Sequence, residues 1–223
     1  MQQQIFIRLI ATTNNHVILS TAYWAPVQYF SKLATSSRIV LEQHENYLKQ
    51  TYRNRCQIAA ANGILSLTVP VLKNHGEKML IRDVRIDYSE AWQLNHWRAI
   101  VSAYRSSPFF EYYEDDFRPF YEKKEIFLFD LNEKILRLAI ELAGLRTVID
   151  YTNQFHEQGF FENDFRYNIT PKAQQSITET KFKPQTYYQV FAAANGFAAN
   201  LSILDLLCNE GPNTLQVLKS CVA

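Results

Sequence analysis

The chain has 223 residues, of which 47% are hydrophobic and 20% are charged, and its formal net charge is +1. A chain of this length can bury a sizeable core, as one large domain or two small ones. The near-neutral charge argues against duplex nucleic acid as a partner, because neutralising phosphates requires a clustered basic excess. No two of the six glycines lie within ten residues of each other, which excludes the Gly-rich phosphate loops of nucleotide-binding proteins.

The sequence shows no recognisable signal for secretion or membrane insertion. The N-terminal residues have no basic leader, and Arg8 interrupts their most apolar part, so we expect neither a signal peptide nor a transmembrane segment. Cys56, Cys208 and Cys221 are odd in number and widely spaced, which indicates reduced thiols and a cytoplasmic location. They also lack the short spacing of zinc ligands, so we expect no metal site.

The first elements follow a strand–helix–strand pattern. Residues 17–19 and 39–41 are apolar runs of strand length, and Pro26 opens a segment between them with apolar residues at helical spacing. Because such a crossover joins parallel strands, we expect residues 17–20 and 38–42 to be neighbours in one sheet.

The remaining elements are also predicted from the spacing of apolar residues. The polar stretch 154–184, which contains two prolines, predicts an extended excursion over the core whose phenylalanines are buried. We expect an N-terminal extension over residues 1–16 and then a single Rossmann-like α/β domain over 17–223, with a mixed β-sheet flanked by helices. Further strands are expected at 64–71, 84–87 and 147–149, and helices at 92–104, 128–142 and 200–207.

The most promising polar residues follow the predicted strand at 38–42. Ligands of open α/β sheets bind beyond the carboxyl ends of the strands, where Glu42 and His44 are expected. We take His44, with Glu42 beside it, as the candidate for proton transfer, because imidazole titrates near neutral pH. Arg53 and Arg55 face the same way if their segment is extended and can then hold one phosphate or carboxylate. The alternative is that both arginines pair with Glu42 and Glu45 in a solvated loop.

Further polar residues extend this candidate substrate site. Tyr23 follows the first strand, and Asn46 and Lys49 follow the second, so we expect all three to contact a substrate. Asp164 and Arg166 are close enough in sequence either to bind a ligand or to pair with each other, and the sequence does not decide between these roles.

His96 is the remaining candidate for substrate binding. It lies beside an apolar stripe on the predicted helix 92–104, and small residues next to it leave space for a ligand. We expect it to contact the crevice, although a histidine in such a position is more often a hydrogen-bonded structural residue. The apolar stripe consists of Leu94, Trp97, Val101 and Tyr104.

Short motifs run through the chain in a distinctive order: Asn46-Tyr47-x-Lys49, Arg53-Asn-Arg55, Leu67-Thr-Val-Pro-Val71, His96-Trp97 and Asn200-Leu-Ser-Ile203. In this order and spacing they resemble the WbqC-like family, bacterial proteins associated with O-antigen and other surface-polysaccharide gene clusters. The resemblance covers nearly the whole chain from about residue 17. It implies a transferase or activating enzyme acting on a nucleotide-linked sugar or similar anionic metabolite, and it names no cofactor. The alternative is a non-enzymatic ligand-binding or scaffolding protein of the same pathway.

The first motif departs from the family pattern. Where the family has Gln-Pro-x-Tyr-Leu-Pro-Trp-x-Gly-Tyr-Phe-x-Lys, this chain has Ser20-Thr-Ala-Tyr-Trp-Ala-Pro-Val-Gln-Tyr-Phe-Ser-Lys32. Tyr23, Tyr29 and Lys32 persist, whereas Ser20 and Thr21 replace Gln-Pro. The departure favours a changed substrate or a binding role without catalysis.

Overall fold

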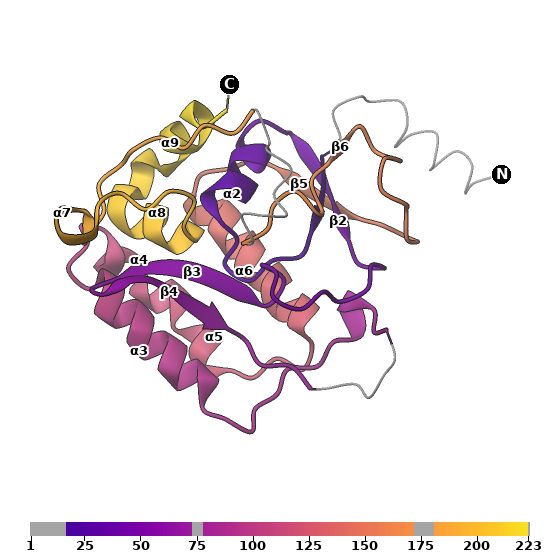
Figure 1. The fold of residues 1–223 in the computed structure, drawn as a ribbon, viewed down its shortest axis with the longest axis horizontal. Coiled ribbons are helices and arrows are strands. Elements are labelled where there is room, and N and C mark those ends of the chain that lie inside the picture. Colours follow the sequence, from indigo (N-terminus) through magenta and orange to yellow (C-terminus); the bar gives the residue numbers. More distant parts are fainter. Residues whose placement is uncertain (1–16, 73–77, 172–180, 223) are drawn as a thin grey trace.

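A four-stranded parallel sheet organises the fold in the computed structural model, which describes residues 17–72, 78–171 and 181–222 (Figure 1). The strands run in the order β5-β2-β1-β6. The expected N-terminal extension, residues 1–16, lies outside the described residues. The four strands are β1 (Val17–Ser20), β2 (Arg38–Glu42), β5 (Val148–Tyr151) and β6 (Asn163–Asp164).

The predicted strand–helix–strand unit is confirmed. β1 and β2 are parallel neighbours, with Leu19 opposite Leu41, and helix α2 (Val27–Ala34) connects them. Leu19 and Leu41 enter the main core, while Ile18 and Val40, at the alternate positions, are buried outside that cluster. Strands of a parallel sheet are covered on both faces, which is why these runs are continuously apolar.

The expected mixed sheet is instead two separate sheets. Every pair in the four-stranded sheet is parallel, and the antiparallel pair among the described strands is a hairpin of β3 (Arg55–Ala60) and β4 (Gly63–Thr68). The strand predicted at 84–87 is wrong, because this segment forms only isolated bridges to Val71 and Phe127. A short apolar run therefore does not by itself fix continuous pairing.

Helices lie beside the hairpin and beside the parallel sheet (Figure 1). The helix predicted at 128–142 is confirmed and ends before Gly144, whose φ of 66° suits glycine. The elements not yet described are α3 (Trp92–Tyr104), α4 (Phe110–Phe117), α5 (Pro119–Glu122), α6 (Leu128–Leu142), α7 (Ala192–Asn195), α8 (Ile203–Glu210), α9 (Thr214–Ser220) and the 3₁₀ turns η1 (Ile81–Asp83) and η2 (Gly211–Asn213).

Helix α3 buries the predicted stripe only in part: Tyr104 is buried, and Trp97 and Val101 are half-buried against the core. Leu94, from the expected stripe, is 46% exposed, whereas Trp92, His96 and Ile100 are buried. Because α3 carries apolar residues around much of its surface, their spacing could not determine which face packs against β3.

The excursion after β5 only partly covers the core. Phe155 and Phe160 are exposed, contrary to the expected burial, while Phe165 is half-buried and packs against the core. Residues 172–180 of this stretch lie outside the described residues. In the described ranges, no helix is long and apolar enough to cross a membrane.

Candidate functional site

A small cleft lies at the carboxyl end of β1, on the side of β6. After β1, the chain places β2 and then β5 on one side of β1, and it returns to place β6 on the other side. The order of the strands therefore reverses between β1 and β6. Open α/β sheets bind ligands at such a switch point, beyond the carboxyl ends of the strands. The cleft is lined by Leu19, Ser20, Thr21, Ala22, Tyr29, Tyr52, Arg53, Phe165, Arg166 and Ile169.

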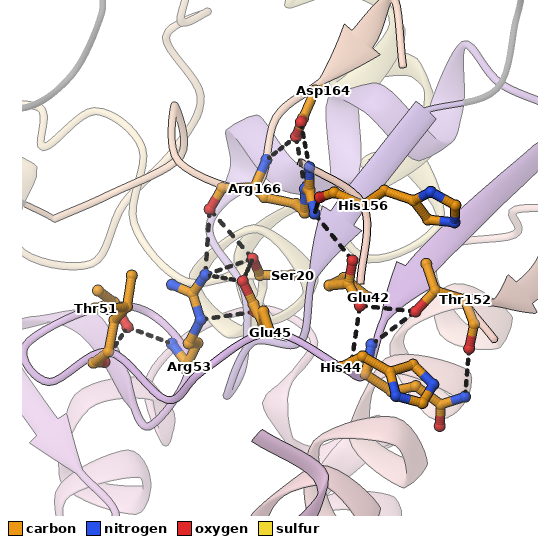
Figure 2. Close-up of polar contacts among 12 residues, drawn as sticks. Ser20, Glu42, His44, Glu45, Thr51, Arg53, Thr152, His156, Asp164 and Arg166 are labelled. Atoms are coloured by element: carbon orange, nitrogen blue, oxygen red, sulfur yellow. Dashed lines mark hydrogen bonds and ion pairs between the residues drawn. The ribbon is translucent and has the colours of Figure 1, made fainter. Parts of the chain in front are cut away.

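Arg53 is held in a buried bidentate ion pair with Glu45. Its Nε donates to Glu45 Oε1 at 2.8 Å and its Nη2 to Oε2 at 2.5 Å, and the two side chains are 4% and 1% exposed (Figure 2). Nη2 also donates to Ser20 Oγ at 2.7 Å. No residue of the described ranges bonds Nη1. The pair therefore neutralises and orients the guanidinium while leaving one terminal nitrogen for a ligand.

Arg166 connects the ends of several strands. Its buried guanidinium donates to Glu42 Oε2 at 2.9 Å, to the His156 carbonyl at 2.8 Å, and to both Asp164 oxygens at 2.9 and 2.6 Å. Its own carbonyl accepts a hydrogen bond from Ser20 Oγ at 3.1 Å. Arg166 thus joins β2, β6 and the loop after β5 around the cleft (Figure 2).

Glu42 serves as an anchor in this arrangement. Its Oε1 accepts the His44 backbone N–H at 2.8 Å and the Thr152 hydroxyl at 2.7 Å, while its Oε2 accepts Arg166. The side chain is fully buried. Both oxygens are occupied by protein donors, so this geometry gives no support to the expected role of Glu42 in proton transfer.

His44 is half-buried two residues beyond β2, and its side chain does not line the cleft. The structure brings a second histidine, His156, into its electrostatic range. Burial lowers the pKa of His156, and Glu42 opposes this shift while Arg166 and His44 reinforce it. Within the described part of the chain, no three potential ligands are grouped to hold a metal ion.

The other predicted site residues near the second strand are not gathered at the cleft. Asn46 and Lys49 are exposed on the loop after β2. Arg55 is half-buried and its Nε donates to Thr68 Oγ1 at 3.2 Å, so it does not share a bonding partner with Arg53. Arg53 lines the cleft and Arg55 does not, so the structure gives no support to the expected arrangement of both arginines around one anion.

Tyr23 and His96 belong to a buried network behind the cleft. Tyr23 Oη lies 3.0 Å from His96 Nδ1 and 3.2 Å from Tyr121 Oη, and Trp24 Nε1 donates to Tyr121 Oη at 2.9 Å. Burial lowers the pKa of His96 to about 4, and an interaction with the Thr68 backbone offsets only part of this. Neither Tyr23 nor His96 lines the cleft, since both side chains are packed in the core.

Thr21 is the residue that sequence reasoning missed. It lines the cleft, it is 2% exposed, and its hydroxyl has no hydrogen-bond partner among the described residues. A buried hydroxyl without a partner costs about 1–3 kcal/mol. Eight other buried side-chain atoms of the described residues also lack a partner, so Thr21 is distinguished by its position in the cleft lining. The signal available in the sequence was its position at the end of the first strand, in the motif that departs from the family pattern.

Comparison with known proteins supports the sequence resemblance. The model of the WbqC-like protein family matches residues 22–217. The chain is 27% identical over 214 residues to "Uncharacterized protein Rv1507c" of Mycobacterium tuberculosis, covering 86% of this chain and 92% of that protein. No solved structure matches. The matched range includes Arg53 and Arg166 and begins directly after Ser20 and Thr21.

Proposed function

Because the chain belongs to the WbqC-like protein family, we propose that it binds a small metabolite in the cleft between β1 and β6. The proposed ligand is a nucleotide-linked sugar or a similar anionic metabolite, and the proposed activity is that of a transferase or activating enzyme. The proposed setting is the cytoplasmic part of surface-polysaccharide biosynthesis of the O-antigen type, on the strength of the sequence resemblance.

The observation that carries the binding proposal is the unpartnered Thr21 hydroxyl at the switch point of the sheet. Among the described residues that line the cleft, Thr21 is the one with a buried side-chain atom that lacks a hydrogen-bond partner, whereas Ser20, Tyr29 and Arg166 all have partners. A strand–helix–strand opening followed by a switch point also supports a Rossmann-like description, in which ligands bind at this place.

For the enzymatic form of the proposal, His44 remains the candidate for proton transfer. It is half-buried beside the neighbouring strand end, and its backbone is fixed by Glu42. His156 is a second imidazole within electrostatic range of His44, and burial lowers the pKa of His156.

A binding role without catalysis is the second candidate. The observation that favours it is the engagement of both cleft guanidiniums and of Glu42 in ion pairs, which leaves the cleft without a free carboxylate base. Such a site can bind a ligand but has no carboxylate among the described residues that is free to accept a proton from it.

A thermal-shift screen tests the proposal. The purified chain is heated with nucleotides, nucleotide-linked sugars and acyl-CoA compounds, and we expect a nucleotide-linked sugar to raise the melting temperature because it binds only the folded state. A screen with no stabilising compound would contradict the proposal. Incubation of the stabilising compound with acceptor sugars, followed by chromatography of the products, separates the two candidates: turnover that is lost in His44→Ala supports an enzyme, and binding without turnover supports a binding protein.

A further inference from the structure

We propose that the cleft between β1 and β6 receives an uncharged oxygen group of the ligand, a hydroxyl of a sugar ring, and keeps the phosphates outside. This assignment rests on the proposed function and names the part of a nucleotide-linked sugar that enters the fold. It follows from the charge balance, the free hydrogen-bonding groups and the apolar part of the cleft lining.

The cations around the cleft are already matched by carboxylates. Arg53 is paired with Glu45, and Arg166 is paired with Glu42 and Asp164, and all five side chains are at most 6% exposed. The two arginines that line the cleft therefore face three carboxylates. A further buried cation, Lys32 on α2, lies 4.9 Å from the centre of the Phe165 ring and is not among the residues that line the cleft.

A phosphate in the cleft would lose its hydration without meeting a positive excess. Desolvating a charge is costly unless an opposite charge compensates it, and the carboxylates beside Arg53 and Arg166 would repel an incoming anion. An uncharged oxygen avoids both costs, because it requires only hydrogen bonds.

The hydrogen-bonding groups left in the cleft suit a hydroxyl. The Thr21 hydroxyl can donate and accept, and it has no partner in the described chain. Arg53 Nη1 is a donor, and no hydrogen bond to a described residue engages it. A sugar hydroxyl can accept from Arg53 while it exchanges a hydrogen bond with Thr21, so each group gains a partner.

Part of the cleft lining is apolar. Leu19, Phe165 and Ile169 form this part together with Ala22. C–H groups of a sugar at the mouth of the cleft can contact the half-buried Phe165 while its hydroxyl enters toward Thr21, whereas a phosphate would present charged oxygens to this ring.

Calorimetric titration of three forms of the chain tests the inference. Wild type, Thr21→Val and the matched control Thr21→Ser are titrated with UDP-glucose, GDP-mannose and dTDP-glucose, with the corresponding nucleoside diphosphates, and with inorganic phosphate. We expect Thr21→Val to weaken binding of the nucleotide sugar about tenfold, which corresponds to about 1.4 kcal/mol, and Thr21→Ser to change it less than threefold. Binding of the diphosphate should be the same in all three forms.

The outcomes separate the inference from the proposed function. If Thr21→Val weakens the diphosphate or inorganic phosphate as much as the nucleotide sugar, the cleft holds the anion and the inference is overturned, while the proposed function stands. If no sugar or diphosphate of the panel binds to the wild type, the proposed function fails and the inference fails with it. The melting temperature provides a folding check, because Thr21→Val removes a hydroxyl without a partner and should not lower it.

A gain-of-binding variant tests the charge argument separately. Glu45→Gln keeps a hydrogen-bond acceptor for Arg53 but removes one compensating charge. We expect inorganic phosphate to bind this variant at least threefold more tightly than it binds wild type. An unchanged affinity in a variant that retains a cooperative unfolding transition would contradict the charge argument.

Discussion

Ser20 and Thr21, the two residues at which the first motif departs from the family pattern, both line the cleft. Ser20 is tied to Glu45 and Arg166, whereas the Thr21 hydroxyl has no partner in the described residues. Tyr29, which persists from the pattern, donates its hydroxyl to the Ser20 carbonyl and so supports the strand end. In the proposed site, the departure therefore falls on the residue whose hydroxyl is proposed to meet the ligand.

The buried pair of Arg53 and Glu45 gives the first prediction. We expect Arg53→Ala to lower the free energy of unfolding by about 3–5 kcal/mol, because it leaves Glu45, 1% exposed, as an uncompensated buried charge. The matched control is Arg38→Ala, which removes an exposed pair with Asp150 and should cost less than about 1 kcal/mol. Urea unfolding measures both, and equal losses for the two variants would contradict the prediction.

The lowered pKa of His96 gives the second prediction. The imidazole titrates at about 4 in the folded chain and near 6.5 when unfolded, so its contribution to stability is complete above pH 6.5 and is lost as the pH falls through 4. We expect the His96 ring to remain neutral at pH 5.5, with a total contribution of about 3 kcal/mol to the pH dependence. NMR titration of the imidazole resonances measures this directly. A midpoint near 6.5 would show that the ring is solvated.

At the scale of elements, helix α8 depends on one cap. Ser202 Oγ accepts the Leu204 N–H at 3.3 Å and donates to the Trp24 carbonyl at 2.8 Å, so one buried hydroxyl both caps α8 and fixes the loop before α2. We expect Ser202→Ala to cost about 1–3 kcal/mol in chemical unfolding, from the lost cap and the unsatisfied carbonyl. The exposed Ser220→Ala is the control, and its loss should stay below about 0.5 kcal/mol. A cost for Ser202→Ala no larger than this would show that α8 does not need the cap.

Elements with strong local patterns could be predicted from the sequence. The runs that form β1 and β2, the helical stripe of α6 and the stop at Gly144 are all local features of the chain, and the structure confirms them. β6 could not be predicted, because its two residues, Asn163 and Asp164, form no apolar run. Their pairing with β1 depends on contacts between residues about 146 positions apart, for which a single sequence offers no periodic signal.

The candidate site shifted for the same reason. Sequence reasoning placed it at the end of β2, where Glu42 and His44 are visible as a polar cluster. In the structure the cleft lies on the other side of β1. There, the segment after β6 brings Arg166 next to Ser20, and the Arg166 guanidinium pairs with Glu42. Arg53 is common to the predicted site and the observed cleft, but its partner Glu45 gives it a different charge environment.

At the scale of the whole molecule, the buried carboxyl of Asp205 and the buried imidazole of His96 make the free energy of unfolding change with pH in opposite directions. Asp205 is fully buried, its Oδ2 accepts from Tyr187 and Gln189, and burial raises its pKa to about 6. Because the folded pKa lies above the unfolded value of 3.8, the contribution of Asp205 to stability is complete below pH 4 and is lost as the pH rises through 6.

Single variants of Asp205 and His96 should reveal these opposite dependences of the free energy of unfolding on pH. Relative to wild type, we expect Asp205→Asn to gain up to about 3 kcal/mol in the free energy of unfolding between pH 4 and 7. His96→Gln should lose relative stability over the same interval, because wild type regains its His96 contribution as the pH rises. Urea unfolding at pH 4.5, 5.5 and 7.5 measures both slopes. If the free energy of unfolding changes with pH in the same way in wild type and Asp205→Asn, burial does not raise the pKa of Asp205.

The most direct test of the ligand site is a crystal structure of the chain with the nucleotide-linked sugar that stabilises it most in the thermal-shift screen. The predicted result is a sugar hydroxyl in the cleft between β1 and β6, with its oxygen about 2.7–3.2 Å from Thr21 Oγ1 and the diphosphate outside the cleft. A ligand bound elsewhere, for example beside His44 at the end of β2 with the cleft unchanged, would contradict the assignment of the site.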